Sequence, residues 1–113
     1  MEKSKNIIYL FGYSLNNYRP LKKMINIIKE QKELGVNITF VFMHDAVIGL
    51  TKKSKMSKHL LDLINLPISF YILQPDLKAR GINPNFILDK IAKIEYANLV
   101  DLLVANSKII SWL

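Results

Sequence analysis

The 113 residues carry 16 Lys and Arg against 9 Asp and Glu, a formal net charge of +7, and include no cysteine. A hydrophobic fraction of 50% with 22% charged residues excludes intrinsic disorder, and a chain of this length builds one core, so we expect a single domain, 1–113. Without cysteine the chain has no disulfide, no thiolate metal ligand, no thiol nucleophile and no persulfide of its own.

Short apolar runs alternate with segments of helical periodicity, which is typical of βαβ units around a mostly parallel sheet. The runs are rich in β-branched and aromatic residues, as strands buried on both faces are. They predict five strands, at residues 7–11, 37–43, 68–73, 92–96 and 108–113. Because parallel strands need crossover connections, we expect helices on both faces, and therefore a three-layer α/β domain.

The first helix is the most clearly patterned, because its apolar residues share one helical stripe. These residues are Leu21, Met24, Ile25 and Ile28. Asn16 and Asn17 offer N-cap oxygens, Pro20 suits a first turn, and Gly35 suits a left-handed C-cap. Further helical segments are predicted at 46–50, 58–65, 75–80 and 97–106. Residues 86–91 fit a helix or a strand equally well.

Ligands of an open parallel sheet usually bind beyond the carboxyl ends of its strands. Three segments lie there, residues 12–17, 44–47 and 74–76. The first has neither the glycine pattern of a dinucleotide site nor the lysine of a phosphate-binding loop. We therefore interpret it as a strand-to-helix turn, in which Tyr13 and Tyr18 either pack or anchor an interface.

His44 and Asp45 are the one adjacent pair whose chemistry suits proton transfer, because an imidazole titrates near neutral pH. Neighbouring side chains rarely point at each other, so Asp45 fits better as a helix N-cap or a partner contact, and His44 as a loop residue. His59 fits the surface of a helix. With two histidines, no cysteine and no metal-ligand spacing, we expect no metal and no cofactor.

Lys52, Lys53 and Lys55 form the densest positive segment and predict an exposed connection. The segment is either a solvated loop or a contact for phosphates or an acidic partner. No aromatic residues interleave it as a base-stacking platform requires. We place these lysines with His44 and Asp45 as candidate partner-binding residues. The basic excess also fits a simple bias of composition towards lysine.

A membrane location is not expected from the sequence. No apolar run approaches the roughly 18–20 residues that cross a bilayer, and residues 1–6 are polar and charged, unlike a signal peptide. We therefore expect a cytoplasmic protein.

Three segments together resemble the DsrH/TusB family within the DsrE/DsrF/DsrH superfamily. His44-Asp45-Ala46-Val47 approximates that family's Gln-Asp-Gly-Val after the second strand, with His44 in place of Gln and Ala46 in place of Gly. Residues 76–82, Asp-Leu-Lys-Ala-Arg-Gly-Ile, are similar to its short helix ending in Ala-Arg-Gly-Leu. The carboxyl-terminal segments 94–96, 100–102 and 111–113 are similar to its ending in order and spacing.

The resemblance implies a subunit of a heterohexamer with DsrE-like and DsrF-like partners. Such assemblies pass persulfide sulfur towards tRNA wobble-uridine thiolation or act in sulfur oxidation, and the DsrE-like partner carries the main thiol. A chain without cysteine would then act as a structural or docking subunit, would meet tRNA only indirectly, and would not be an enzyme by itself. In isolation it can also pair with itself.

Two other classes of function stay open at this point. A free-standing RNA-binding module would use the basic surface and lose affinity steeply with salt. A small enzyme would depend on His44 and Asp45, and a His44→Ala variant with unchanged turnover would remove that hypothesis.

Overall fold

The computed structural model describes residues 5–15 and 19–113, in which five strands form one sheet in the order β4-β3-β2-β1-β5. All four pairings are parallel. The strands are β1 (Asn6–Phe11), β2 (Asn37–Phe42), β3 (Ser69–Leu73), β4 (Ile91–Ile94) and β5 (Lys108–Trp112). The predicted parallel sheet is confirmed, and β1, β2 and β3 occupy its interior positions.

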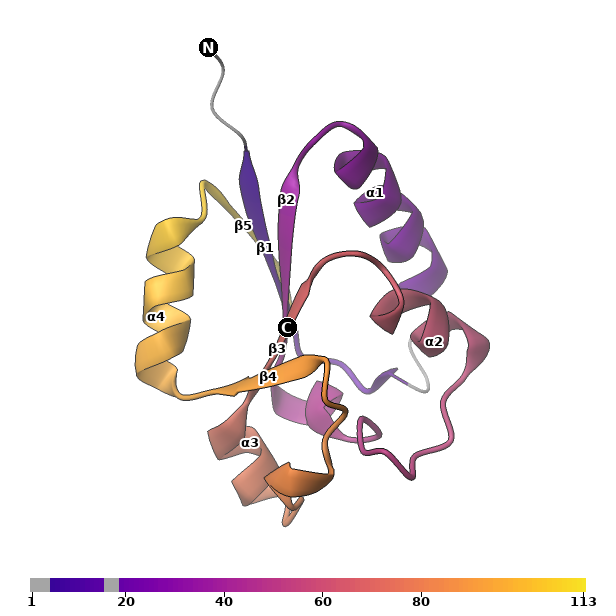
Figure 1. The fold of residues 1–113 in the computed structure, drawn as a ribbon, viewed down its shortest axis with the longest axis vertical. Helices are drawn as coiled ribbons and strands as arrows, with labels where there is room; N and C mark the ends of the chain where they lie inside the picture. The colour runs from indigo at the N-terminus through magenta and orange to yellow at the C-terminus, as the bar shows by residue number, and fades with distance from the viewer. Residues whose placement is uncertain (1–4, 16–18) are drawn as a thin grey trace.

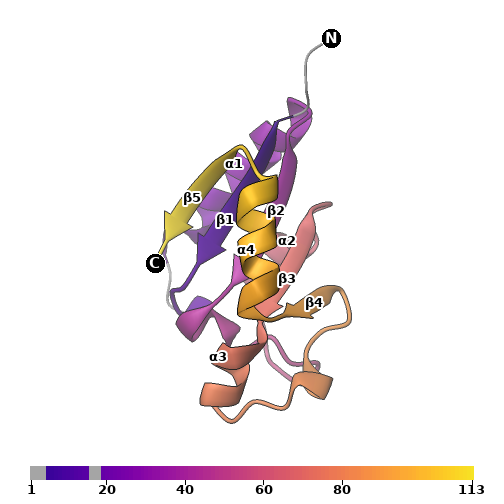
Figure 2. The same cartoon turned by 90° about the vertical axis from the view of Figure 1, so that its left-hand side faces the viewer.

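Helices lie on both faces of this sheet, as Figures 1 and 2 show. The helices α1 (Leu21–Glu33) and α2 (Lys58–Ile64) cover one face, and α4 (Tyr96–Ala105) crosses the other. The short helix α3 (Gln74–Ala79) and the 3₁₀ turns η2 (His44–Val47) and η3 (Pro84–Phe86) lie beyond the carboxyl ends of the strands. The predicted three-layer α/β architecture is therefore confirmed.

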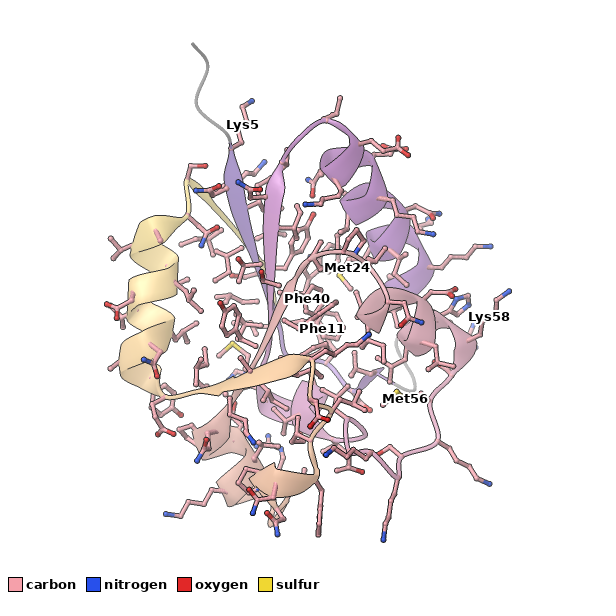
Figure 3. All side chains as sticks on the ribbon, viewed as in Figure 1. Lys5, Phe11, Met24, Phe40, Met56 and Lys58 are labelled. Atoms are coloured by element: carbon pink, nitrogen blue, oxygen red, sulfur yellow. The ribbon has the colours of Figure 1, made fainter. Side chains whose placement is uncertain are left out.

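The larger core lies between the sheet and α1 and α2, and aromatic rings fill its centre. Phe40 contacts four other rings, with centroids 4.9 Å from Phe42, 5.8 Å from Phe11 and 6.0 Å from both Tyr9 and Phe70. Figure 3 shows Phe11 and Phe40 beside Met24 of α1. Buried aromatic rings in contact stabilise a core through the large apolar area that each removes from water.

The core on the α4 side is smaller. Leu99 of α4 packs on strand residues that include Ile8, Leu10, Val41 and Leu73. In the part of the chain that the structure describes, α4 is the single helix over this face, whereas two helices cover the other.

The ends of α1 follow the sequence prediction where they can be compared. Gly35 adopts φ +83°, its N–H donates to the Lys32 carbonyl at 3.0 Å, and the Val36 N–H donates to the Gln31 carbonyl at 3.1 Å. This left-handed ending confirms the predicted glycine cap. Pro20 stands at the N-cap position, and the predicted caps Asn16 and Asn17 lie outside the described residues.

The region around the fourth strand differs from the prediction. Residues 86–91 are neither one helix nor one strand: Phe86 ends η3, Ile87 bridges to Thr51, and Ile91 opens β4. The strand ends at Ile94 rather than 96, because Glu95 forms a capping box with Asn98 and starts α4 at Tyr96.

No helix within residues 5–15 and 19–113 is long and apolar enough to cross a membrane.

The Tyr9 hydroxyl gives a pH-dependent test of this packing. It donates a 2.6 Å hydrogen bond to Gln31 Oε1 of α1, and burial raises the pKa of the Tyr9 phenol above its ordinary value of about 10. A raised pKa in the folded state contributes stability that is present below pH 10 and lost as the pH rises through the folded value. In urea titrations, the free energy of unfolding of the wild type should therefore fall more steeply above pH 10 than that of Tyr9→Phe. Parallel curves for the two proteins would contradict this.

Candidate functional site

The carboxyl ends of β1, β2 and β5 lie side by side at one edge of the sheet and are joined by backbone hydrogen bonds. The Gly12 N–H donates to the Trp112 carbonyl, and the Met43 N–H donates to the Phe11 carbonyl, both at 2.9 Å. A Cβ at position 12 would lie 2.8 Å from Leu113 Cδ2 and 3.0 Å from His44 Nδ1. A larger residue at position 12 would therefore require the side chains of Leu113 and His44 to move.

The backbone of His44 is held in an unusual conformation. His44 has φ +52° and is the one non-glycine residue with positive φ among those described. Its N–H donates to Asp76 Oδ2 at 2.6 Å. A left-handed residue other than glycine costs about 1–2 kcal/mol, so the Asp76 carboxylate fixes a turn that the chain alone disfavours.

Arg80 joins the turn after β2 to the helix after β3. Its Nε and Nη2 donate to Asp45 Oδ1 at 3.3 and 3.1 Å, and its Nη1 donates to the Asp76 carbonyl at 3.2 Å. Nη1 also lies 3.9 Å from Asp76 Oδ1. The guanidinium therefore ties η2 to α3 through both carboxylate-bearing residues.

These contacts define one group of residues, which we call the carboxyl-edge cluster: Gly12, His44, Asp45, Asp76, Arg80 and Leu113. Its side chains grade from buried to exposed, with Asp76 12%, Arg80 27% and Asp45 63% accessible. The guanidinium of Arg80 donates its hydrogen bonds to other groups of the protein. The arrangement is therefore a rigid polar rim rather than an anion site. Such a rim can present Asp45 and His44 to another molecule.

The structure corrects the predicted role of Asp45 as a helix cap. The helical turn begins at His44, two residues earlier than expected, and it is a short 3₁₀ turn with Met43 at the N-cap position and no side-chain cap. Asp45 lies inside that turn, and its carboxylate accepts from Arg80. His44 and Asp45, predicted together as candidate partner contacts, are thus held by different residues: Asp76 within α3 and Arg80 directly after it.

The predicted lysine segment forms an exposed connection between η2 and α2. Lys52, Lys53 and Lys55 are all exposed. Lys52 pairs with Asp89 at 3.0 Å, and its N–H donates to the Phe86 carbonyl at 2.8 Å. Of the five candidate residues, His44 and Asp45 are therefore held by Asp76 and Arg80, and Lys52 is held by Phe86 and Asp89.

The support that Asp76 and Arg80 give to the turn after β2 was not predicted from the sequence. The signal was present, because Asp76 lies on a short helix that follows a parallel strand, and Arg80 follows Asp76 at i+4 as the C-cap of that helix. The missing information was that β2 and β3 are neighbours in the sheet, which places this helix beside η2. Within residues 5–15 and 19–113, no group of three or more His, Asp or Glu residues is placed to hold a metal ion.

The fold defines a class of small parallel α/β proteins. The structure is similar to that of the YchN protein from E. coli, with a TM-score of 0.77 over 96% of this chain and 99% of that chain. It is also similar to MTH1491 from Methanobacterium thermoautotrophicum, a protein of unknown function, with a TM-score of 0.70 over 96% and 99% of the two chains. Identity is 14% in both cases, so these likenesses concern the fold alone.

The model of the DsrH-like protein family matches residues 14–109, and the chain belongs to this family. It is 45% identical over 56 residues to Protein TusB of Serratia proteamaculans (strain 568) and 38% identical over 64 residues to Protein TusB of Shigella flexneri. These matches cover 50% and 57% of this chain and 58% and 66% of the two relatives. The family resemblance proposed from the sequence is confirmed.

Two aspartates give a matched test of the carboxyl-edge cluster. Asp76→Ala removes the acceptor of the His44 N–H and should lower the free energy of unfolding by about 1–3 kcal/mol. Asp89→Ala removes an ion pair whose carboxylate is 89% accessible and should change it by less than about 0.5 kcal/mol. Urea unfolding measures both. Equal losses would show that Asp76 does not hold the turn.

Proposed function

We propose that this chain is a non-catalytic subunit of a cytoplasmic sulfur-relay assembly that serves tRNA wobble-uridine thiolation. In this proposal it is a docking partner for cysteine-bearing DsrE-like and DsrF-like subunits. The observation that carries it is the combination of membership in the DsrH-like family with a sequence that contains no cysteine. The relatives named Protein TusB favour tRNA thiolation over sulfur oxidation.

The absence of a thiol determines which role in a relay is chemically open. A sulfane sulfur atom travels as a persulfide, which forms on a cysteine thiolate. The imidazole, carboxylates and guanidinium of the carboxyl-edge cluster cannot carry sulfur in this way. The chain's contribution is then a surface that positions the sulfur-bearing loop of another subunit.

Two exposed groups support such a docking role. His44 and Asp45 present polar atoms on a turn that α3 holds rigid, so little side-chain and loop entropy is lost on binding. Lys53 and Lys55 add positive charge on the neighbouring connection. Charge at the rim of an interface accelerates encounter with an acidic partner more than it prolongs the complex.

Reconstitution tests the proposal directly. The chain should co-elute with the DsrE-like and DsrF-like proteins of its own organism as one complex in gel filtration. After incubation of that complex with a cysteine desulfurase and cysteine, intact-mass spectrometry should find added sulfur on a partner and none on this chain.

Two outcomes would contradict the proposal. One is strictly monomeric elution in the presence of every DsrE-like and DsrF-like protein. The other is retention of tRNA by the isolated chain with a steep loss between low and moderate salt, which would favour the RNA-binding alternative.

Charge reversal tests the lysine segment separately. The double variant Lys53→Glu, Lys55→Glu should slow association with the partners by on the order of tenfold at low salt, and leave the dissociation rate nearly unchanged. Lys22→Glu, Lys23→Glu on α1 is the matched control, with the same change of charge on another exposed segment. Surface plasmon resonance measures both rates. Equal effects of the two double variants would show that only net charge matters.

A further inference from the structure

The outward side of α4 carries large apolar side chains although it faces solvent, and its exposed polar residues are Asn98 and Asp101. Tyr96 and Val100 are both 57% accessible, and Val104 is 81% accessible. The helix contains no lysine or arginine, and Asp101 is its one charged residue. A helix that is apolar on its outer side as well as its inner side is normally buried by something.

The comparison with α1 shows that this is a property of α4 and not of the whole chain. The sequence of α1, Leu-Lys-Lys-Met-Ile-Asn-Ile-Ile-Lys-Glu-Gln-Lys-Glu, places charged residues along its solvent side. In a protein with a net charge of +7, α4 is therefore an exception, because it has no basic residue and one acidic residue.

The neighbouring edge of the sheet has the same character. Within the described residues β5 is an outer strand that pairs with β1, and after Lys108 it continues as Ile-Ile-Ser-Trp with no charge and no proline. Ile109 is 48% accessible and Leu113 is 50% accessible. Free edges of soluble proteins usually carry charges, prolines or bulges that prevent pairing with another chain.

These residues lie on one side of the molecule. Ile109 is paired with Ile8, which packs in the α4-side core, so Ile109 points to the same face as α4. Figure 2 shows α4 and β5 together on the side that faces the viewer. We call this surface the α4–β5 face: Tyr96, Val100, Val104, Ile109 and Leu113. Leu113 also belongs to the carboxyl-edge cluster, so the two surfaces are continuous.

We propose that the α4–β5 face is the surface through which this chain binds a cysteine-bearing subunit of the DsrE-like or DsrF-like kind. The contact surface of that partner would be an apolar patch with an acidic rim. This inference rests on the proposed function and assigns that function to a surface. A parallel sheet is normally covered on both faces, and here one helix covers the α4 side. A second subunit would supply the missing cover.

Charge favours this occupant over two others. A second copy of this chain would bring two bodies of net charge +7 together, whereas a partner with carboxylates would meet Lys108 and Lys5 at the amino ends of β5 and β1. Nucleic acid needs lysine or arginine to neutralise its phosphates, and α4 has neither.

A pair of matched variants tests the assignment. Val104→Lys places a charge on the α4–β5 face, and Leu34→Lys places the same charge at the end of α1 on a residue of equal accessibility, 81% against 82%. Val104→Lys should weaken binding to the purified DsrE-like and DsrF-like proteins by about 30-fold or more in calorimetry. Leu34→Lys should change it less than about threefold. Both variants should keep the wild-type circular dichroism spectrum and melting temperature.

Hydrogen exchange on the wild-type complex gives a second measurement, with slowed exchange expected at 96–105 and 108–113 and not at 21–33. Normal binding by Val104→Lys, together with unprotected 96–105, would overturn this assignment and leave the proposed function standing. A wild-type chain that binds none of these proteins would overturn both. A homodimer that Val104→Lys disrupts would assign the face to a second copy and refute the partner named here.

Discussion

Parallel pairing of all five strands is the constraint on which the rest of the structure depends. It sends every strand in one direction, so the turns after β1, β2 and β3 and the end of β5 meet at one edge of the sheet. Contacts between residues far apart in sequence follow from it. Arg80 reaches Asp45, Asp76 reaches His44, and Leu113 lies against Gly12. An antiparallel β5 would remove Leu113 from this edge.

The sequence predicted the fold because periodicity and end signals agreed with each other. Buried strands were recognisable as apolar runs, and Gly35 ended α1 in the left-handed conformation that was expected. Residues 86–91 escaped prediction because their structure is set by a bridge to Thr51, which is distant in sequence. The predicted cap role of Asp45 was wrong for the same reason. Its partner Arg80 is 35 residues away, so capping propensity alone pointed to the wrong bond.

The family assignment and the structure limit the chemistry in the same way. The chain belongs to the DsrH-like family, and its 113 residues offer no thiol on which a persulfide could form. What it offers instead is shape: a rigid rim at the carboxyl edge of the sheet, joined through Leu113 to an uncharged face of α4 and β5. In the proposed assembly both features would lie against companion subunits, and exposed apolar patches often mark such contacts.

The most direct measurement follows labelled sulfur from a donor to tRNA, with and without the companion subunits. The account predicts that this chain alone incorporates no label into itself or into tRNA, and that adding it to the cysteine-bearing subunits increases their transfer. Thiolation of tRNA by this polypeptide in the absence of any other relay protein would contradict the account.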